Sequence, residues 1–172
     1  EDYVWFLADG LRQFKQARDL ARQTWESRQR VLGSNHRDTL MSLDTYACTL
    51  VGIRDLAQAE RLSRQCYEAR RAALGEDDPD TAQSRNNLAW VLTEAGRRNE
   101  AERLVRSALL NVRTKGVTHT DYLASLSLLS ELLSHLGRNQ EGKDLLKVAL
   151  AEAIPVHGDE NPVILRLQRR LL

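Results

Sequence analysis

The sequence repeats itself at an interval of about 42 residues, and this repetition restricts the chain to folds built from stacked copies of one small unit. The clearest pair of segments is Leu32–Thr39 and Leu74–Thr81, which lie 42 residues apart. Weaker copies return at Lys115–Tyr122 and His157–Pro162. Each unit of such an array buries its apolar face against the next unit, so the sequence predicts an elongated core and a surface suited to binding.

Two amphipathic helices are predicted within one unit. Apolar residues recur at helical spacing through Asp80–Ala95 and again through Glu100–Val112. Gly96 between the two segments is suited to end the first helix, because glycine adopts left-handed backbone angles at little cost. Asp78 and Asn161 each precede a proline, which is the pattern of a capping side chain before the first helical residue. The chain is therefore predicted to be all-α.

Small residues recur where the two helices of a unit would approach each other. The first helices place Ala47, Ala89 and Ser130 at one position, and the second helices place Ala59, Ala101 and Gly142 near their starts. Two turns later the second helices carry Thr24, Cys66, Ala108 and Ala149. We interpret Cys66 as a small buried residue in an alanine position and not as a nucleophile.

Composition and motifs exclude several functional classes. The 25 basic and 24 acidic residues leave a formal net charge of +1, so no strong field would recruit nucleic acid or an anionic membrane. Cys48 and Cys66 have neither the spacing of a zinc site nor that of a disulfide framework. The sequence also lacks a phosphate-binding glycine loop and the common hydrolase motifs. We therefore expect no cofactor, no metal and no enzymatic activity.

The landmarks of the unit resemble the tetratricopeptide repeat (TPR). The most specific stretch is Asn86–Leu92 followed by Gly96–Leu104, and the resemblance is to the 42-residue variety found in kinesin light chains. It implies a right-handed α-solenoid of antiparallel helix hairpins, the TPR superhelix. Gly52-Ile53-Arg54 places the expected glycine two residues early, which predicts a distorted turn between the helices of that unit.

The same resemblance predicts a single TPR domain over residues 1–172 that begins and ends within a repeat. Its parts are a partial first repeat, three complete repeats and a truncated final helix, over residues 1–32, 33–75, 76–116, 117–158 and 159–172. The chain starts with Glu1, which indicates a piece of a longer protein. Apolar residues in Asp2–Phe6 and Val163–Leu172 need a cover, and either further sequence, a second copy or the last helix itself would supply it.

By analogy with the family, the first helix of each unit lines a concave wall that binds a peptide. The partner-binding residues predicted in this way are Asp44, Gln83, Asn86, Asn87, Trp90, Thr93, Glu94, Ser127, Glu131 and His135, with Met41 and Cys48 at equivalent places. Trp90 is either a binding anchor or a packing residue against the neighbouring helix. His36 and His119 occupy equivalent loops, which favours a turn or capping role for both over catalysis.

Two functions remain open at this point. The first is a cytoplasmic protein-interaction module that binds a peptide or a partner domain in its concave groove. The alternative is a regulatory, ligand-sensing or self-assembling arm of a larger signalling protein of the NTPase type, with self-association through exposed terminal helices. Both functions imply protein partners and neither implies nucleic acid or membrane.

Overall fold

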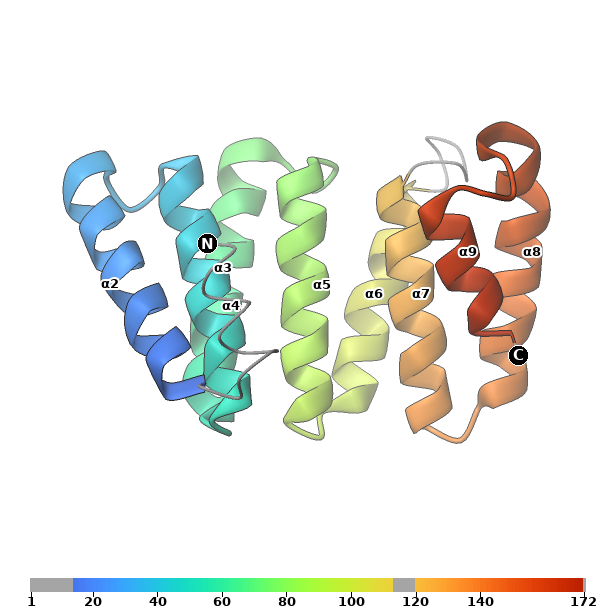
Figure 1. The fold of residues 1–172 in the computed structure, drawn as a ribbon, viewed down its shortest axis with the longest axis horizontal. Helices are drawn as coiled ribbons and strands as arrows, with labels where there is room; N and C mark the ends of the chain where they lie inside the picture. Colours follow the sequence, from blue (N-terminus) through green and yellow to red (C-terminus); the bar gives the residue numbers. More distant parts are fainter. Residues whose placement is uncertain (1–13, 113–119, 172) are drawn as a thin grey trace. The chain divides into compact units, whose positions relative to one another are not determined.

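The structure, a computed structural model, describes residues 14–112 and 120–171, and this part of the chain is helical apart from short connections (Figure 1). Its helices are α2 (Phe14–Leu32), α3 (Arg37–Gly52), α4 (Leu56–Leu74), α5 (Pro79–Glu94), α6 (Arg98–Val112), α7 (Thr120–His135), α8 (Asn139–His157) and α9 (Pro162–Arg169). Residues 1–13 of the predicted partial first repeat lie outside the described residues. No helix in the described ranges is long and apolar enough to cross a membrane.

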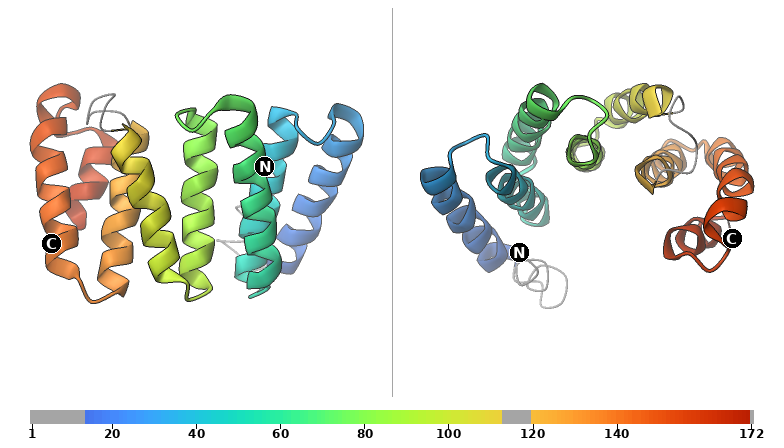
Figure 2. Two further views of the ribbon diagram at one scale, coloured as in Figure 1. Left: turned by 180° about the vertical axis from the view of Figure 1, so that it is seen from behind. Right: turned by 90° about the horizontal axis from the view of Figure 1, so that it is seen from above.

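The chain divides into two compact units, 1–96 and 97–172, which are described separately below as unit 1 and unit 2. Within unit 1, α2 packs on α3, α3 on α4 and α4 on α5, and within unit 2 the same order holds from α6 to α9 (Figure 2). Helices that are consecutive in sequence are therefore neighbours in space, which confirms the prediction of an all-helical repeat array. The division falls between α5 and α6, inside the predicted repeat 76–116.

The core of unit 1 combines leucine and valine side chains with the small residues that the repeat pattern places inside. Ala47, Ala59 and Cys66 are fully buried, and Tyr46 is buried next to them. The ring of Trp25 from α2 stacks on the ring of Tyr46 from α3, with 5.8 Å between the ring centres. The alanine-sized residues let the helices approach closely, and the aromatic pair fills the space where the helices diverge.

The core of unit 2 extends into the last helix. Ile164 and Leu167 of α9 are fully buried among leucines of α7 and α8, whereas Leu165 faces outward. A Cβ atom added at Gly142 of α8 would lie 3.0 Å from the hydroxyl oxygen of Ser130 on α7, which shows how closely these helices approach. The final helix thus covers the end of unit 2 with its own apolar face.

Side chains that precede the helices cap them as the sequence predicts. Asp78 and Asn161 each accept a hydrogen bond from the backbone N–H two residues later, at 2.9 Å in both cases. His36 does the same for α3, since its Nδ1 accepts from the backbone N–H of Asp38 at 3.2 Å. The capping role predicted for His36 is therefore confirmed. His119 lies outside the described residues.

The prediction of a distorted turn after α3 is wrong. Arg54 has φ of +64°, and Gly96 and Gly137 have φ of +78° and +77° at the equivalent places after α5 and α7. Arg54 therefore adopts the left-handed conformation that glycine adopts in the other turns. Gly52 is instead a helical residue whose missing side chain makes room, because a Cβ atom there would lie 2.4 Å from the ring of Phe14.

We expect replacement of Arg54 by glycine to stabilise unit 1 by about 0.5–1 kcal/mol, because a non-glycine residue pays for the left-handed conformation. The change also removes the exposed ion pair between Arg54 and Glu94, at 3.1 Å, which contributes little. Urea unfolding would measure the difference. Arg54→Ala is the control, since it loses the same ion pair and keeps the strained backbone; equal stability of the two variants would contradict the argument.

Two arginines 42 residues apart join one repeat to the next in unit 1. Nη1 of Arg28 on α2 donates to the hydroxyl of Ser42, at 2.7 Å, and to the backbone carbonyl of Asp38. Nη1 of Arg70 on α4 donates to the hydroxyl of Ser84, at 2.6 Å, and to the backbone carbonyl of Asp80. We call these contacts the arginine bridges. Each one fixes the first turns of a following helix against the helix before it.

Candidate functional site

A groove of about 560 Å³ lies on unit 1 between α3 and α5, with α4 behind it. Four of the predicted binding residues line it, namely Asp44, Gln83, Asn87 and Trp90. Its other lining residues are Arg37, Asp38, Met41, Thr45, Cys48, Arg70 and Asp80. The structure thus brings together one part of the predicted surface within a single unit.

The walls of the groove are the same face of two equivalent helices. Met41, Thr45 and Cys48 occupy successive turns of α3, and Gln83, Asn87 and Trp90 stand 42 residues later on α5. The repeat period therefore pairs Met41 with Gln83, Thr45 with Asn87 and Cys48 with Trp90 on the two walls. Trp90 is only partly buried, and it both lines the groove and packs on the core of unit 1. The packing contact predicted for Trp90 is therefore observed, and its role as a binding anchor stays a prediction.

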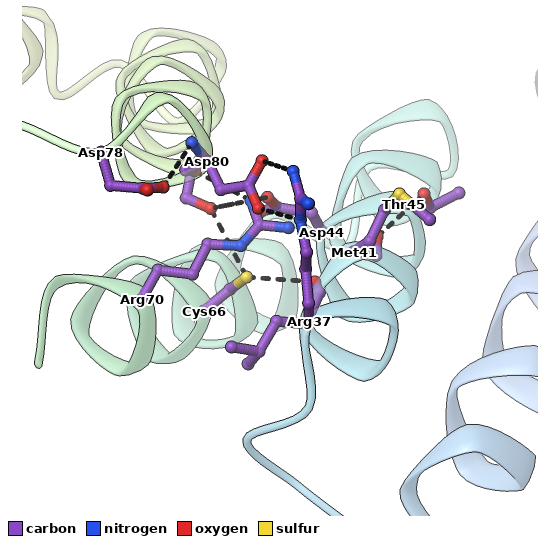
Figure 3. Close-up of polar contacts among 10 residues, drawn as sticks. Arg37, Met41, Asp44, Thr45, Cys66, Arg70, Asp78 and Asp80 are labelled. Atoms are coloured by element: carbon purple, nitrogen blue, oxygen red, sulfur yellow. Dashed lines mark hydrogen bonds and ion pairs between the residues drawn. The ribbon is translucent and has the colours of Figure 1, made fainter. Parts of the chain in front are cut away.

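Asp44 lines this groove and is 5% exposed. Its Oδ2 atom accepts hydrogen bonds from Arg70 Nη1, at 2.8 Å, and from the hydroxyl of Ser84, at 2.7 Å (Figure 3). Arg70 is buried as well, so the pair is a desolvated salt bridge that links α3, α4 and α5. The arginine bridge of Arg70 and the carboxylate of Asp44 form one network.

Burial raises the pKa of Asp44 above its ordinary value, while the charge of Arg70 and polar contacts with the side chains of Ser84, Cys66 and Asn87 oppose the rise. The second carboxylate oxygen, Oδ1, is buried and has no hydrogen-bond partner among the described residues. A buried polar atom without a partner is uncommon in folded proteins. The Asp44 carboxylate therefore has one buried oxygen without a hydrogen-bond partner, on a residue that lines the groove.

A second ion pair closes one end of the groove. The guanidinium of Arg37, at the start of α3, donates to both carboxylate oxygens of Asp80, at 2.6 and 3.1 Å. Asp80 stands in the first turn of α5, so this two-point contact joins the beginnings of the two walls (Figure 3). Arg37 also lowers the pKa of Asp80 below its ordinary value.

The structure places the other predicted residues of α5 away from the groove. Asn86 is partly buried and does not line it, although it has a polar contact elsewhere. Thr93 is 9% exposed, and its hydroxyl donates back to the carbonyl of Ala89 at 2.7 Å. Glu94 is exposed and pairs with Arg54. Their role in partner binding stays a prediction.

The predicted residues of α7 lie on unit 2 near the last helix. Glu131 accepts from Arg170 at 2.8 Å, and the backbone carbonyl of Ser127 accepts from the same guanidinium at 3.1 Å. Glu131 and His135 line an open polar hollow together with Lys143. The carboxylate of Glu131 is thus already hydrogen-bonded to Arg170.

The chemistry of these residues supports binding and offers little for catalysis. Burial raises the pKa of Cys66 to about 12, so its thiol stays protonated at neutral pH, and burial raises the pKa of Cys48 further. The Cys66 thiol donates to the carbonyl of Leu40 at 3.2 Å. Within residues 14–112 and 120–171, no three His, Cys, Asp or Glu side chains are placed to hold a metal ion.

Sequence reasoning missed Arg37, Arg70 and Asp80 as parts of this site. A signal for Arg70 was present, because Arg28 and Ser42 recur as Arg70 and Ser84 at the repeat period. That recurrence identifies a structural contact between repeats. It contains no information about Asp44, whose counterparts in the two following units are the uncharged residues Asn86 and Ser127.

Comparison with protein families identifies the repeat. The tetratricopeptide repeat family matches residues 52–109, and a second model of tetratricopeptide repeats matches residues 8–38. Both matches are to repeats, and neither is to a catalytic domain. No curated protein has a significantly similar sequence.

Solved structures share the fold. Two crystal structures of a protein of Podosopora anserina, described as a kinesin light chain with nearly identical TPR-like repeats, align with TM-scores of 0.76 and 0.75. Each is 23% identical to the chain, and each alignment covers 96% of this chain and 78% of the other. BtubC (BKLC) from P. vanneervenii aligns with a TM-score of 0.67 and 15% identity, over 80% of this chain and 55% of the other.

Proposed function

The chain is a tetratricopeptide repeat protein, a class whose domains generally mediate protein–protein interactions, and we propose that the groove between α3 and α5 binds an extended segment of a protein partner. The observation that carries this proposal is that Gln83, Asn87 and Trp90 line one wall of a groove on successive turns of α5.

The side chains of the groove suit an extended peptide. Amide groups such as those of Gln83 and Asn87 both donate and accept hydrogen bonds, as the backbone of an extended segment requires. Trp90 and Met41 offer apolar surface for a side chain of the partner, and Met41 is 40% exposed. A large, partly buried aromatic residue is a typical anchor of binding energy.

Two neighbouring asparagines give a matched test. We expect Asn87→Ala to weaken the binding of peptides selected by display on this chain about 5- to 30-fold, the loss that follows when hydrogen bonds to an amide are removed. Trp90→Ala should weaken binding by a similar factor or more. Isothermal titration calorimetry would measure the dissociation constants.

Asn86→Ala is the control, because Asn86 has the same chemistry and half-buried position but does not line the groove. It should leave the dissociation constant within about twofold. If selected peptides bound equally well to the Asn87 and Trp90 variants, the groove would not be the binding site. Thermal melts of all three variants would show that each remains folded.

A further inference from the structure

We propose that the groove of unit 1 recognises a lysine side chain of the partner segment, whose ammonium group donates to the open Oδ1 atom of Asp44. This inference rests on the proposed function and names the chemistry of its ligand. The juxtaposition that carries it is a buried carboxylate oxygen without a partner and a tryptophan along the same groove.

The open oxygen requires a donor. Oδ2 of Asp44 is fully used, since Arg70 and Ser84 both donate to it. Oδ1 is the only accepting position of this carboxylate that the described residues leave free. Because this oxygen is buried, the lysine side chain must displace a side chain of the groove wall to reach it. The contact would then be made in a dry environment, where a charge-assisted hydrogen bond is strongest.

The charges around the groove favour a cation. Three carboxylates line it, those of Asp38, Asp44 and Asp80, against two guanidiniums, those of Arg37 and Arg70. One excess negative charge remains, and both guanidiniums are already bound to carboxylates. A partner side chain with one positive charge would neutralise this excess, whereas an acidic side chain would be repelled by it.

The geometry favours lysine over arginine. A guanidinium binds best to two oxygens of one carboxylate, and Asp44 offers only one. An ammonium group is a compact point charge that is satisfied by separate acceptors, and the amide side chains of Gln83 and Asn87 line the same groove. The aliphatic part of a lysine side chain and its charge also suit the face of Trp90.

The test changes the ligand first and the protein second. Peptides selected by display on the intact chain would be resynthesised with each lysine replaced in turn by Nε-acetyl-lysine or by arginine, and titrated by calorimetry. We expect acetylation of one lysine to weaken binding roughly 10- to 100-fold, as for a hydrogen bond to a charged group, and arginine to weaken it less. Asp44→Asn should remove most of this preference for lysine over acetyl-lysine.

Glu68→Gln is the matched control, because it neutralises an exposed carboxylate on α4 away from the groove and should leave the preference intact. The titrations with modified peptides need no change to the protein, so they test the lysine inference even if Asp44→Asn does not fold. Peptides that lose affinity with Trp90→Ala but tolerate acetylation of every lysine would overturn the lysine inference and leave the proposed function standing. Absence of any peptide sensitive to Trp90→Ala would overturn both.

Discussion

Replacement of Asp44 by alanine is expected to lower the free energy of unfolding of unit 1 by about 3–5 kcal/mol, because the change leaves the buried charge of Arg70 without its partner. Ser84 loses the same acceptor. The energy of a desolvated charge dominates this figure, and the lost contacts between side chains are a smaller part. Urea unfolding followed by far-UV circular dichroism would measure it.

An exposed ion pair in the same unit provides the control. Glu94→Ala removes the partner of Arg54, whose side chain is 66% exposed, and should cost less than about 1 kcal/mol. A double replacement of Asp44 by leucine and Arg70 by methionine removes both buried charges, and it should restore most of the stability lost in Asp44→Ala. If Asp44→Ala and Glu94→Ala were equally mild, water would reach the buried pair and the desolvation argument would fail.

Replacement of Leu167 by alanine is expected to destabilise unit 2 by about 2–5 kcal/mol, as for other fully buried leucines. Leu167 and Ile164 hold the eight-residue helix α9 against the leucines of α7 and α8. A helix this short is not stable without its packing partners, so its backbone hydrogen bonds should open together. Hydrogen exchange of the α9 amides would report the local effect, and urea unfolding the total.

Leu165→Ala removes the same atoms from a side chain that is 41% exposed on the same helix. We expect this control to cost less than about 1 kcal/mol, since the side chain loses little buried surface. Fast exchange of the α9 amides already in the unmodified chain would show that the helix does not cover the end of unit 2.

Local rules predict most of the fold. The repeat period, the glycines and the capping residues depend on short stretches of sequence, so Asp78, Asn161 and the small core residues could be identified without a structure. The turn at Arg54 could not, because the packing of α3 and α4 holds an arginine in a conformation that its own preference disfavours.

The candidate site was only partly predictable. The repeat register placed Gln83 and Trp90 on the correct face of α5, because helical spacing alone determines that face. It could not show that Asn87 lines the groove and Asn86 does not. The two are adjacent in sequence, and which of them faces the groove depends on how α5 is rotated about its own axis. The open oxygen of Asp44 depends on contacts from three helices and is visible only in three dimensions.

Buried arginines were the least predictable feature. Arg85 is buried at a position that leucine occupies in the neighbouring repeats, as Leu43 and Leu126. It lies 3.4 Å from a carboxylate oxygen of Glu76, a residue of the preceding connection. In a chain with so many arginines, no pattern in the sequence separates Arg85 from the arginines that face solvent.

The arginine bridges bear on how such a chain can lengthen in evolution. One 42-residue segment carries an acceptor, such as Ser42, in its first helix and a donor, such as Arg70, near the end of its second helix. Tandem duplication of one whole segment therefore creates a new junction that already has both halves of its contact. An insertion inside a helix would rotate the donor away from its acceptors, whereas copying a whole unit preserves this contact without further substitutions.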